Sequence, residues 1–316
     1  MLSKIRRFLN TPAVKIMFSF DYYMGFPSSH GFHSIDTMKF KKVRDRLLKE
    51  KIISRKHFRI PEMVSYEDMA LVHTEEYIKS IQDPLKVARM LRIGAVDPWD
   101  SFILEYFRTV TGGTILAMEC ALKTGGTTFN LGGGFHHAYP DQAAGFCLIN
   151  DVAIAIEKAR IHHDIQRIMI IDLDYHQGEC NLLFFQNNPE VFTFSMHATK
   201  WLELEKENNI DILLQHGISG TRYLKILQDN LLPEIASFEP QLVFYIAGAD
   251  TYEHDTLCDL NISREDMLER NLLVWKTLQT ENIPMVIVAG GGYGLESWKI
   301  YYDYLAAIIK GKKIDF

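Results

Sequence analysis

Residues 170–178 place two aspartates and a histidine directly after an apolar run. Alternate residues of an extended strand point the same way. Asp174 and His176 therefore converge on one point, and Asp172 lies on the same side but further back. One carboxylate oxygen and one imidazole nitrogen are suitable ligands for zinc. The alternative is a capped strand end with a hydrogen-bonded histidine, and this motif alone does not decide between the two.

Three glycines followed by two histidines form a second motif, at residues 131–138. The glycines allow the backbone to bend sharply and to approach a ligand closely. His136 and His137 are of the residue type best matched to proton transfer near neutral pH. Adjacent histidines also occur in packed cores, so this motif by itself is equally consistent with packing.

Two further apolar runs end in residues that could complete a site. Asp250 follows residues 242–249 and would be a third metal ligand, which leaves one position open for water as in catalytic zinc sites. Tyr293 follows the glycines at 290–292, and its phenol could donate a hydrogen bond to a polarised carbonyl. A loop-capping aspartate and a half-buried tyrosine are the plainer interpretations.

These motifs must be positioned by a repeating set of elements. Six short apolar runs predict buried strands, at residues 14–19, 127–130, 167–172, 191–196, 242–247 and 285–289. Helical spacing lies between them, at residues 115–122, 152–160 and 264–279. The helix starts are marked by the breaker Gly112-Gly113, by Asn150 or Asp151, and by Ser263. The alternation predicts a three-layer α/β/α fold with a mostly parallel sheet, whose carboxyl ends carry the site.

Bulk composition limits the class of protein. Hydrophobic residues make up 47% and charged residues 23% of the 316 residues, and we expect one catalytic domain over residues 1–316. The net charge of −6 argues against nucleic-acid binding. The four cysteines form no CxxC pair, which disfavours a sulfur-based zinc site and a disulfide framework. Without an apolar run of about 18 residues or a clear signal peptide, a cytoplasmic enzyme is expected, or a nuclear one in a eukaryote.

Three segments stand outside the regular pattern. Residues 53–63 are predicted to be a loop, and the charge-rich stretch 200–209 a solvated face. Apolar residues at 2, 5, 8 and 9 repeat at helical spacing among basic residues, and they predict a short helix within residues 1–13. Docking of this helix onto the domain is favoured over contact with a membrane surface.

The order and spacing of these motifs resemble the histone deacetylases over nearly the whole chain. The motifs lie at residues 132–138, 145–147, 172–178, 247–250 and 291–293, and residues 72–77 also resemble a family segment. Residues 111–114, 132–137 and 176–178 are most similar to the class IV branch. The resemblance implies the arginase/deacetylase fold and metal-dependent hydrolysis of acyl-lysine in a protein or peptide.

The resemblance also implies roles for individual residues. Asp174, His176 and Asp250 match the ligands of one Zn²⁺, and this oxygen-rich set would also accept Fe²⁺. His136 and His137 match the tandem catalytic histidines, with His137 as the general base and acid.

Further roles concern the substrate channel. Tyr293 matches the tyrosine that polarises the carbonyl, and Gly145 and Phe146 match residues that line the acyl-lysine tunnel. The loop after residue 197 lacks the usual family pattern. Trp201 and Leu202 are therefore both candidates for the second tunnel wall.

Two carboxylates would support the histidines. Asp172 matches the buried carboxylate that orients His136. Glu179 stands where many relatives have a shorter residue, and its longer side chain leaves open whether it pairs with His137. The resemblance further implies a structural K⁺ site, formed around Asp172, Asp174, His176, Ser195 and Met196.

Three alternatives share these motifs. A ureohydrolase of the arginase type would need a second metal, but Gly178 and Gly248 stand where its extra carboxylates are expected. A small-molecule amidohydrolase, such as an acetylpolyamine hydrolase, would use the same site. A catalytically inactive binding scaffold is disfavoured because all the expected chemical residues are present.

The region after His33 bears on acyl-chain length. It contains Lys39, Lys41 and Lys42 and no arginine before Arg44, whereas acetyl-selective relatives often have an arginine there. A flexible lysine can move aside more readily than a planar guanidinium. Together with the resemblance to class IV, this predicts that long acyl-lysines are hydrolysed better than acetyl-lysine.

Overall fold

The computed structural model describes residues 14–22, 36–92, 101–204 and 207–311. The predicted N-terminal helix within residues 1–13, and His33, lie outside the described residues. No helix within the described ranges is long and apolar enough to cross a membrane.

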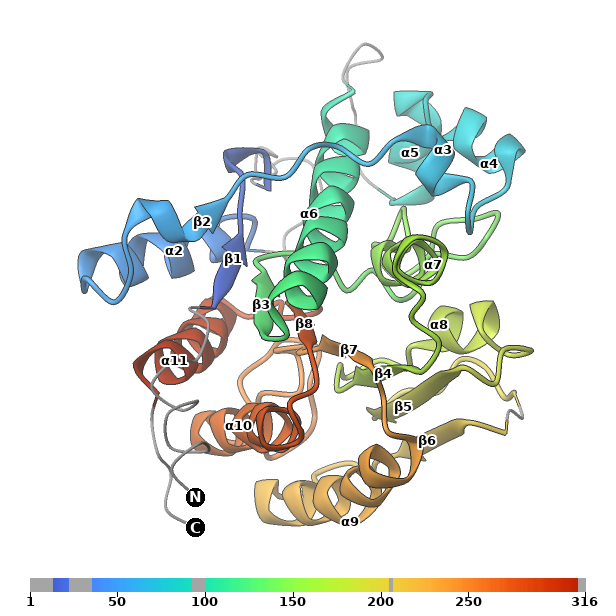
Figure 1. The fold of residues 1–316 in the computed structure, drawn as a ribbon. Helices are drawn as coiled ribbons and strands as arrows, with labels where there is room; N and C mark the ends of the chain where they lie inside the picture. The colour runs from blue at the N-terminus through green and yellow to red at the C-terminus, as the bar shows by residue number, and fades with distance from the viewer. Residues whose placement is uncertain (1–13, 23–35, 93–100, 205–206, 312–316) are drawn as a thin grey trace.

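The described strands form one sheet in which each neighbouring pair is parallel (Figure 1). The order across the sheet is β2-β1-β3-β8-β7-β4-β5-β6. The strands are β1 (Lys15–Met17), β2 (Phe58–Arg59), β3 (Thr127–Asn130), β4 (Ile168–Asp172), β5 (Val191–His197), β6 (Asn209–Leu213), β7 (Leu242–Ile246) and β8 (Met285–Val288). β3, β4, β5, β7 and β8 are buried at all positions, as expected for a parallel sheet covered on both faces. The predicted α/β fold is confirmed.

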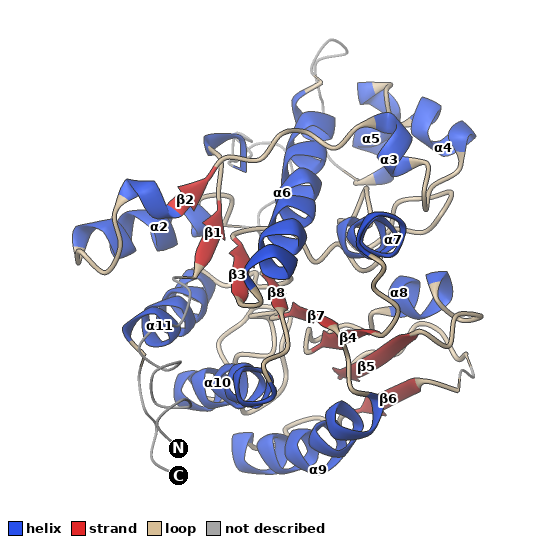
Figure 2. Cartoon of the chain, viewed as in Figure 1, coloured by secondary structure: helices blue, strands red, loops and turns tan. Residues whose placement is uncertain are grey.

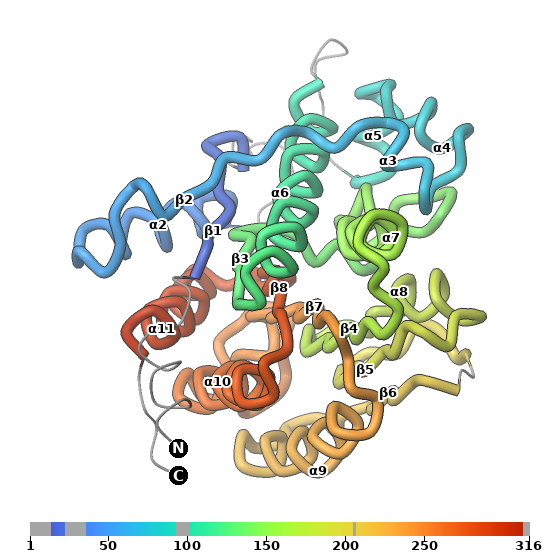
Figure 3. The backbone as a smooth tube through the Cα atoms, in the orientation of Figure 1, coloured from blue at the N-terminus to red at the C-terminus, as the bar shows by residue number. Residues whose placement is uncertain are grey.

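Helices form the two outer layers (Figure 2). One face carries α6 (Phe102–Thr124), α7 (Asp151–His163) and α8 (Glu179–Phe184), and the other carries α9 (Gly220–Phe238), α10 (Arg264–Glu281) and α11 (Ser297–Lys310). α2 (Lys39–Lys49) packs against α11. The shorter elements are η1 (Phe20–Tyr22), η3 (Arg55–His57), α3 (Tyr66–Met69), α4 (Glu75–Ser80) and α5 (Pro84–Met90). The backbone trace shows β4 and β7 side by side in the sheet, although about 70 residues separate them in the chain (Figure 3).

All six predicted strands are present, with ends that differ by three residues or fewer, and the bounds of β3 are those predicted. The structure adds β2 and β6, the two edge strands. β2 lies inside the stretch 53–63 that we predicted to be a loop, so that prediction was wrong there. The first four residues of β6 are partly exposed, and its last residue is fully exposed. Edge strands bury less surface, and neither segment therefore carries the continuous apolar run that marks a central strand.

The prediction that Gly112-Gly113 breaks the chain before a helix was wrong. Both glycines lie buried inside α6, which is 23 residues long. A Cβ atom added at Gly112 would lie 1.8 Å from the backbone oxygen of Glu62, and one added at Gly113 would lie 1.8 Å from the hydroxyl of Tyr22. The two glycines are therefore required by close packing against α6, which outweighs their low helix propensity.

Two predicted helix starts agree with the structure. The Asn150 side chain accepts a hydrogen bond of 2.9 Å from the backbone N–H of Ala153 and caps α7. Ser263 caps α10 in a reciprocal pair with Asp266. Both caps satisfy amide groups that the first helical turn leaves without a partner. The first cap also ends the loop that carries Gly145 and Phe146.

Candidate active site

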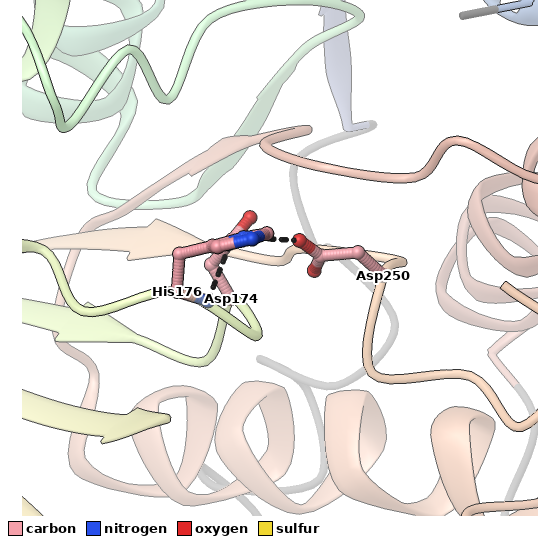
Figure 4. Close-up of side chains that lie close together, drawn as sticks. All are labelled: Asp174, His176 and Asp250. Carbon is pink, nitrogen blue, oxygen red and sulfur yellow. Dashed lines mark hydrogen bonds and ion pairs between the residues drawn. The ribbon is translucent and has the colours of Figure 1, made fainter. Parts of the chain in front are cut away.

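The predicted metal ligands converge at the carboxyl ends of two adjacent central strands. Asp174 and His176 follow β4, and Asp250 follows β7, its neighbour in the sheet. The Nδ1 atom of His176 lies 3.2 Å from a carboxylate oxygen of Asp174 and 3.2 Å from one of Asp250 (Figure 4). One ligand atom from each residue lies within 4.8 Å of the other two. Two oxygens and one nitrogen at this spacing could hold one metal ion, and three protein ligands are the number found in catalytic zinc sites.

Burial of the cluster makes its carboxylates favourable neighbours for a cation. Burial and the negative charge of Asp174 raise the pKa of Asp250 to about 7. Burial alone would lower the pKa of His176, but its hydrogen bonds to Asp174 and Asp250 outweigh this and raise the pKa to about 10. Both shifts show carboxylates crowded in a medium of low polarity. A divalent cation would relieve this repulsion, so the donor set fits a metal.

Close backbone packing around Asp174 leaves no room for a further ligand side chain at position 248. The amide of Gly291 donates a hydrogen bond of 2.8 Å to a carboxylate oxygen of Asp174. A Cβ atom added at Gly248 would lie 2.5 Å from the same carboxylate oxygen. No side chain fits at position 248 without displacing Asp174. A second carboxylate ligand at that position, as in the binuclear alternative, is therefore sterically excluded.

The two adjacent histidines contact different carboxylates. The Nδ1 atom of His136 lies 2.7 Å from Asp172, and the Nδ1 atom of His137 lies 2.7 Å from Glu179. Their ring centroids are 4.1 Å apart. The long side chain of Glu179, at the start of α8, thus reaches His137 while remaining fully buried. Both histidines lie beside the metal cluster, with Nε2 of His136 3.7 Å from Asp174.

These contacts give the two histidines opposite protonation. Burial lowers the pKa of His136, but the charges of Asp172 and Asp174 and the hydrogen bond that the ring donates to Asp172 outweigh it and raise the pKa to about 10. Burial and the positive charge of His136 lower the pKa of His137 to about 4, although Glu179 opposes the shift. At neutral pH, His136 is therefore a cation and His137 is a neutral base.

Asp151 fixes the glycine-rich loop that leads into the two histidines. Gly133 and Gly134 have φ of +80° and +79°, in the region that favours glycine. The Asp151 carboxylate accepts hydrogen bonds from the amides of Gly134 and Phe135, at 3.1 Å and 2.8 Å. It also accepts one of 2.6 Å from the hydroxyl of Thr114 on α6. The first residue of α7 therefore shapes the loop after β3, a role that the sequence did not indicate.

Gly145 and Phe146 form a tight turn at the mouth of the site. The backbone groups of Ala144 and Cys147 exchange two hydrogen bonds, and both central residues have positive φ, +51° and +61°. This is the backbone pattern of a type I′ turn. Phe146 is 43% exposed, and its ring centroid lies 6.2 Å from that of Tyr293. A Cβ atom at position 145 would lie 2.1 Å from the ring of His137, which explains the glycine.

Tyr293 is held by a buried aspartate that our sequence analysis did not single out. Asp255 accepts hydrogen bonds from the amides of Tyr293 and Gly294, at 2.6 Å and 2.9 Å, and from the hydroxyl of Ser297 at 3.2 Å. Burial and the charges of Asp250 and Asp174 raise the pKa of Tyr293 well above its ordinary value, so the phenol keeps its proton. The only sequence signal for Asp255 was its position in the loop after the β7 motif.

Of the two candidates for the second tunnel wall, Trp201 is the one that lies against His137. Its ring stacks on that of His137 at a centroid distance of 4.2 Å and an interplanar angle of 15°. The side-chain oxygen of Gln177 accepts hydrogen bonds from the amides of Trp201 and Leu202, at 2.7 Å and 2.8 Å. Trp201 remains 47% exposed. The stretch 200–209 therefore contributes one wall of the site, in addition to the solvated residues predicted for it.

The residues of the predicted K⁺ site lie at adjacent strand ends. Asp172 on β4 pairs with Ser195 on β5 in the sheet register, and Met196 follows on β5. Asp172 also accepts a hydrogen bond of 3.1 Å from the amide of Asp174. The residues are thus brought together, and the binding of K⁺ stays a prediction.

A cavity continues from the cluster into the protein. Apart from the site residues, its wall includes Tyr22, Lys39, Phe40, Tyr106, Phe107 and Phe135. Of the three lysines considered from the sequence, Lys41 and Lys42 pair with Asp45 and Asp36, whereas Lys39 is buried in the cavity wall. Its ammonium group donates hydrogen bonds to the carbonyls of Gly292 and Gly291, at 3.1 Å and 3.5 Å.

Comparison with known proteins gives a consistent result. The chain matches the histone deacetylase domain family over residues 33–309. It is 34% identical over 286 residues to an uncharacterised protein of Picosynechococcus sp., covering 90% of this chain and 93% of that protein. It is 31% identical over 305 residues to Histone deacetylase 2 of Arabidopsis thaliana, covering 92% and 77%. The structure of an HDAC homolog complexed with SAHA has a TM-score of 0.79 at 26% identity, covering 96% of this chain and 85% of that chain.

Proposed function

This chain belongs to the histone deacetylase family, whose members are metal-dependent amidohydrolases, and on that premise we propose that it hydrolyses Nε-acyl-lysine in proteins or peptides with one Zn²⁺. The observation that carries the proposal is the pair of histidines. The two rings lie side by side next to the cluster of three candidate metal ligands, and each is hydrogen-bonded through Nδ1 to its own buried carboxylate. Such a pair suits amide hydrolysis, in which one group removes a proton from water and another stabilises developing negative charge.

Asp174, His176 and Asp250 would hold the metal, which when bound polarises the amide carbonyl and lowers the pKa of a water towards ~7. His137 directs Nδ1 at Glu179, so its Nε2 is free to accept the proton of the attacking water. The same proton then passes to the nitrogen of the leaving lysine, which restores neutral His137.

Two donors act on the oxygen of the substrate carbonyl. Tyr293 keeps its phenolic proton and donates a hydrogen bond to the developing oxyanion, a contribution of ~3 kcal/mol for a donor of this type. His136 remains a cation above the buried Asp172 and adds positive charge beside the cluster. Phe146 and Trp201 would enclose the lysine stem between the two aromatic walls of the entrance.

The metal stoichiometry tests the proposal directly. We expect elemental analysis to find one Zn²⁺ per chain, and Asp250→Ala to lose both the metal and the hydrolysis of an acyl-lysine peptide, because that variant removes one of three ligands. Glu253→Ala, which changes an exposed carboxylate on the same loop, is the matched control. Two metals per chain, or full metal binding by Asp250→Ala, would show that Asp174, His176 and Asp250 do not form a site for a single metal.

The cavity beyond the cluster supports a preference for long acyl chains. Its described wall contains seven phenylalanine and tyrosine side chains alongside glycines and polar residues, and each buried methylene contributes ~0.8 kcal/mol. The sequence suggested that a lysine here could move aside, but Lys39 is held in place. Its ammonium group donates hydrogen bonds to the carbonyls of Gly291 and Gly292, directly before Tyr293, and these bonds keep it at one side of the cavity.

Acyl-chain preference is tested by kcat/KM for acetyl-, octanoyl- and myristoyl-lysine in the same peptide. We expect the value to rise with chain length as more methylenes are buried. Acetylpolyamines belong in the same panel, because a small-molecule amidohydrolase would prefer them to every peptide. A steady fall from acetyl to myristoyl would show that the cavity does not take the acyl chain.

A further inference from the structure

A charged side chain lies in an unusual place behind the metal cluster. Arg270 is on α10, beneath the sheet, and its relative exposure is 0%. Arginine is almost never fully buried unless its charge is compensated, because removing it from water is costly. The sequence pattern of α10 places Arg270 on the same buried face as Met267 and Val274, a position that normally takes an apolar residue.

The guanidinium group of Arg270 contacts both loops that carry metal ligands. It donates a hydrogen bond of 3.0 Å to the carbonyl of Leu173, the residue before Asp174. It also donates bonds of 3.0 Å to the carbonyl of Gly248 and 2.8 Å to the hydroxyl of Thr251, on either side of Asp250. One rigid, planar group thus spans the carboxyl ends of β4 and β7.

The acceptors of Arg270 are neutral. Besides these loops, the guanidinium donates to the side-chain oxygen of Asn271, at 2.9 Å and 3.0 Å, and it interacts with the phenol of Tyr223. Its positive charge is therefore not consumed by a direct carboxylate partner. Asp174 follows the bound carbonyl of Leu173 by one residue, Asp250 follows that of Gly248 by two, and both carboxylates are buried. The two carboxylates repel each other, and the positive charge of Arg270 reduces the energetic cost of this repulsion.

The spacing of the two loops leaves little tolerance. A Cβ atom at Gly248 would lie 2.6 Å from the Cα atom of Asp174, so the two backbones are in close contact where Arg270 joins them. A small separation of the loops would move Asp174 away from Asp250. Groups that orient metal ligands in this way typically change metal affinity by ~10- to 100-fold when removed.

We infer that Arg270 is a positioning residue that holds the loops bearing Asp174 and Asp250 at the separation required for metal binding. The inference rests on the proposed metal site. It assigns to α10 a function that neither the ligands nor the catalytic histidines provide, because none of them connects the two loops through a rigid hydrogen-bonded fork.

The test compares the affinity of the metal-free protein for Zn²⁺ in three variants, by competition with a chromophoric chelator. Arg270→Gln removes the charge and the fork, and we expect Zn²⁺ binding to weaken by ~10- to 100-fold. Arg270→Lys keeps the charge but not the fork, and we expect a smaller loss. Leu278→Ala, at a buried apolar position further along α10, should lower the melting temperature without changing the affinity.

The outcomes separate the two proposals. If the unaltered protein does not bind Zn²⁺, the proposed function fails and the inference fails with it. If the unaltered protein and Arg270→Gln bind Zn²⁺ equally, only the inference is overturned. Equal weakening by Leu278→Ala would also overturn it, because loss of stability alone would then explain the effect. Should Arg270→Gln not fold, Arg270→Lys with unchanged affinity would contradict the inference.

Discussion

The pKa values of His136 and His137 are shifted in opposite directions, although the two residues are adjacent in the chain and each contacts a buried carboxylate. Beneath His136 lie Asp172 and Asp174, at the end of a central strand, and they raise its pKa to about 10. Glu179 also acts to raise the pKa of His137, but burial and the positive charge of His136 outweigh it and lower the pKa to about 4. The comparison shows that the surroundings of each ring, and not residue type, determine which histidine is the base.

Replacement of the neutral histidine should have the largest effect. We expect His137→Ala to lower kcat by ~1,000-fold, because it removes the group that takes and returns the proton. His136→Ala is the matched comparison and should cost less, since the metal and Tyr293 would still stabilise the oxyanion. Steady-state kinetics with equal metal content in both variants provides the measurement. A milder loss in His137→Ala than in His136→Ala would reverse the assignment of base.

Tyr293→Phe should come next, with kcat lower by ~100-fold and metal content unchanged, because one oxyanion donor is lost. Tyr302→Phe is a suitable control, since that phenol contacts Glu50, distant from the cluster in the described structure. Single-turnover rates of both variants measure the chemical step. Near-normal turnover by Tyr293→Phe would mean that the metal and His136 polarise the carbonyl without the phenol.

Asp172→Asn would remove the main anion beneath His136. The pKa of His136 should then fall from about 10, because the cation loses its closest negative partner. The basic limb of kcat/KM should move to lower pH, with kcat at neutral pH reduced by ~10-fold. A basic limb that does not move would show that His136 is not required as a cation.

Glu179→Gln should have the smallest effect. The carboxylate of Glu179 stabilises protonated His137, so its loss lowers the pKa of His137 further below about 4. The acid limb of kcat/KM should therefore shift to lower pH, while the weaker base lowers kcat by ~3- to 10-fold. Glu157→Gln, in which a carboxylate paired with Arg160 on α7 is changed, should leave the profile unaltered. A shift of the acid limb to higher pH would contradict the assigned contact.

The sequence by itself determined where the polar groups of the site lie along the chain. Apolar runs of strand length identified most of the central strands, because strands that are buried on both faces are largely apolar. The period of two within a strand then predicted that Asp174 and His176 point the same way. Both arguments depend only on near neighbours in the chain, which a sequence displays directly.

Tertiary structure alone decided which distant groups meet. Gly112-Gly113 looked like a helix break, and only the approach of residue 62 and Tyr22 explains why two glycines stand inside α6. Trp201 reaches His137 because Gln177 holds its loop, and the sequence left Leu202 equally suitable. In the same way, the sequence shows Arg270 only as a charged residue of a helix, and the fold brings it into contact with the loops after β4 and β7.

The protonation of the histidine pair belongs to the same class of property. A pKa depends on the burial of a group and on the charges within a few ångströms of it. Asp172 and Glu179 are 36 and 42 residues away from their histidine partners in the chain. The sequence therefore determined that two histidines are available, whereas their burial and the carboxylates at the end of β4 decided which is the cation and which is the base.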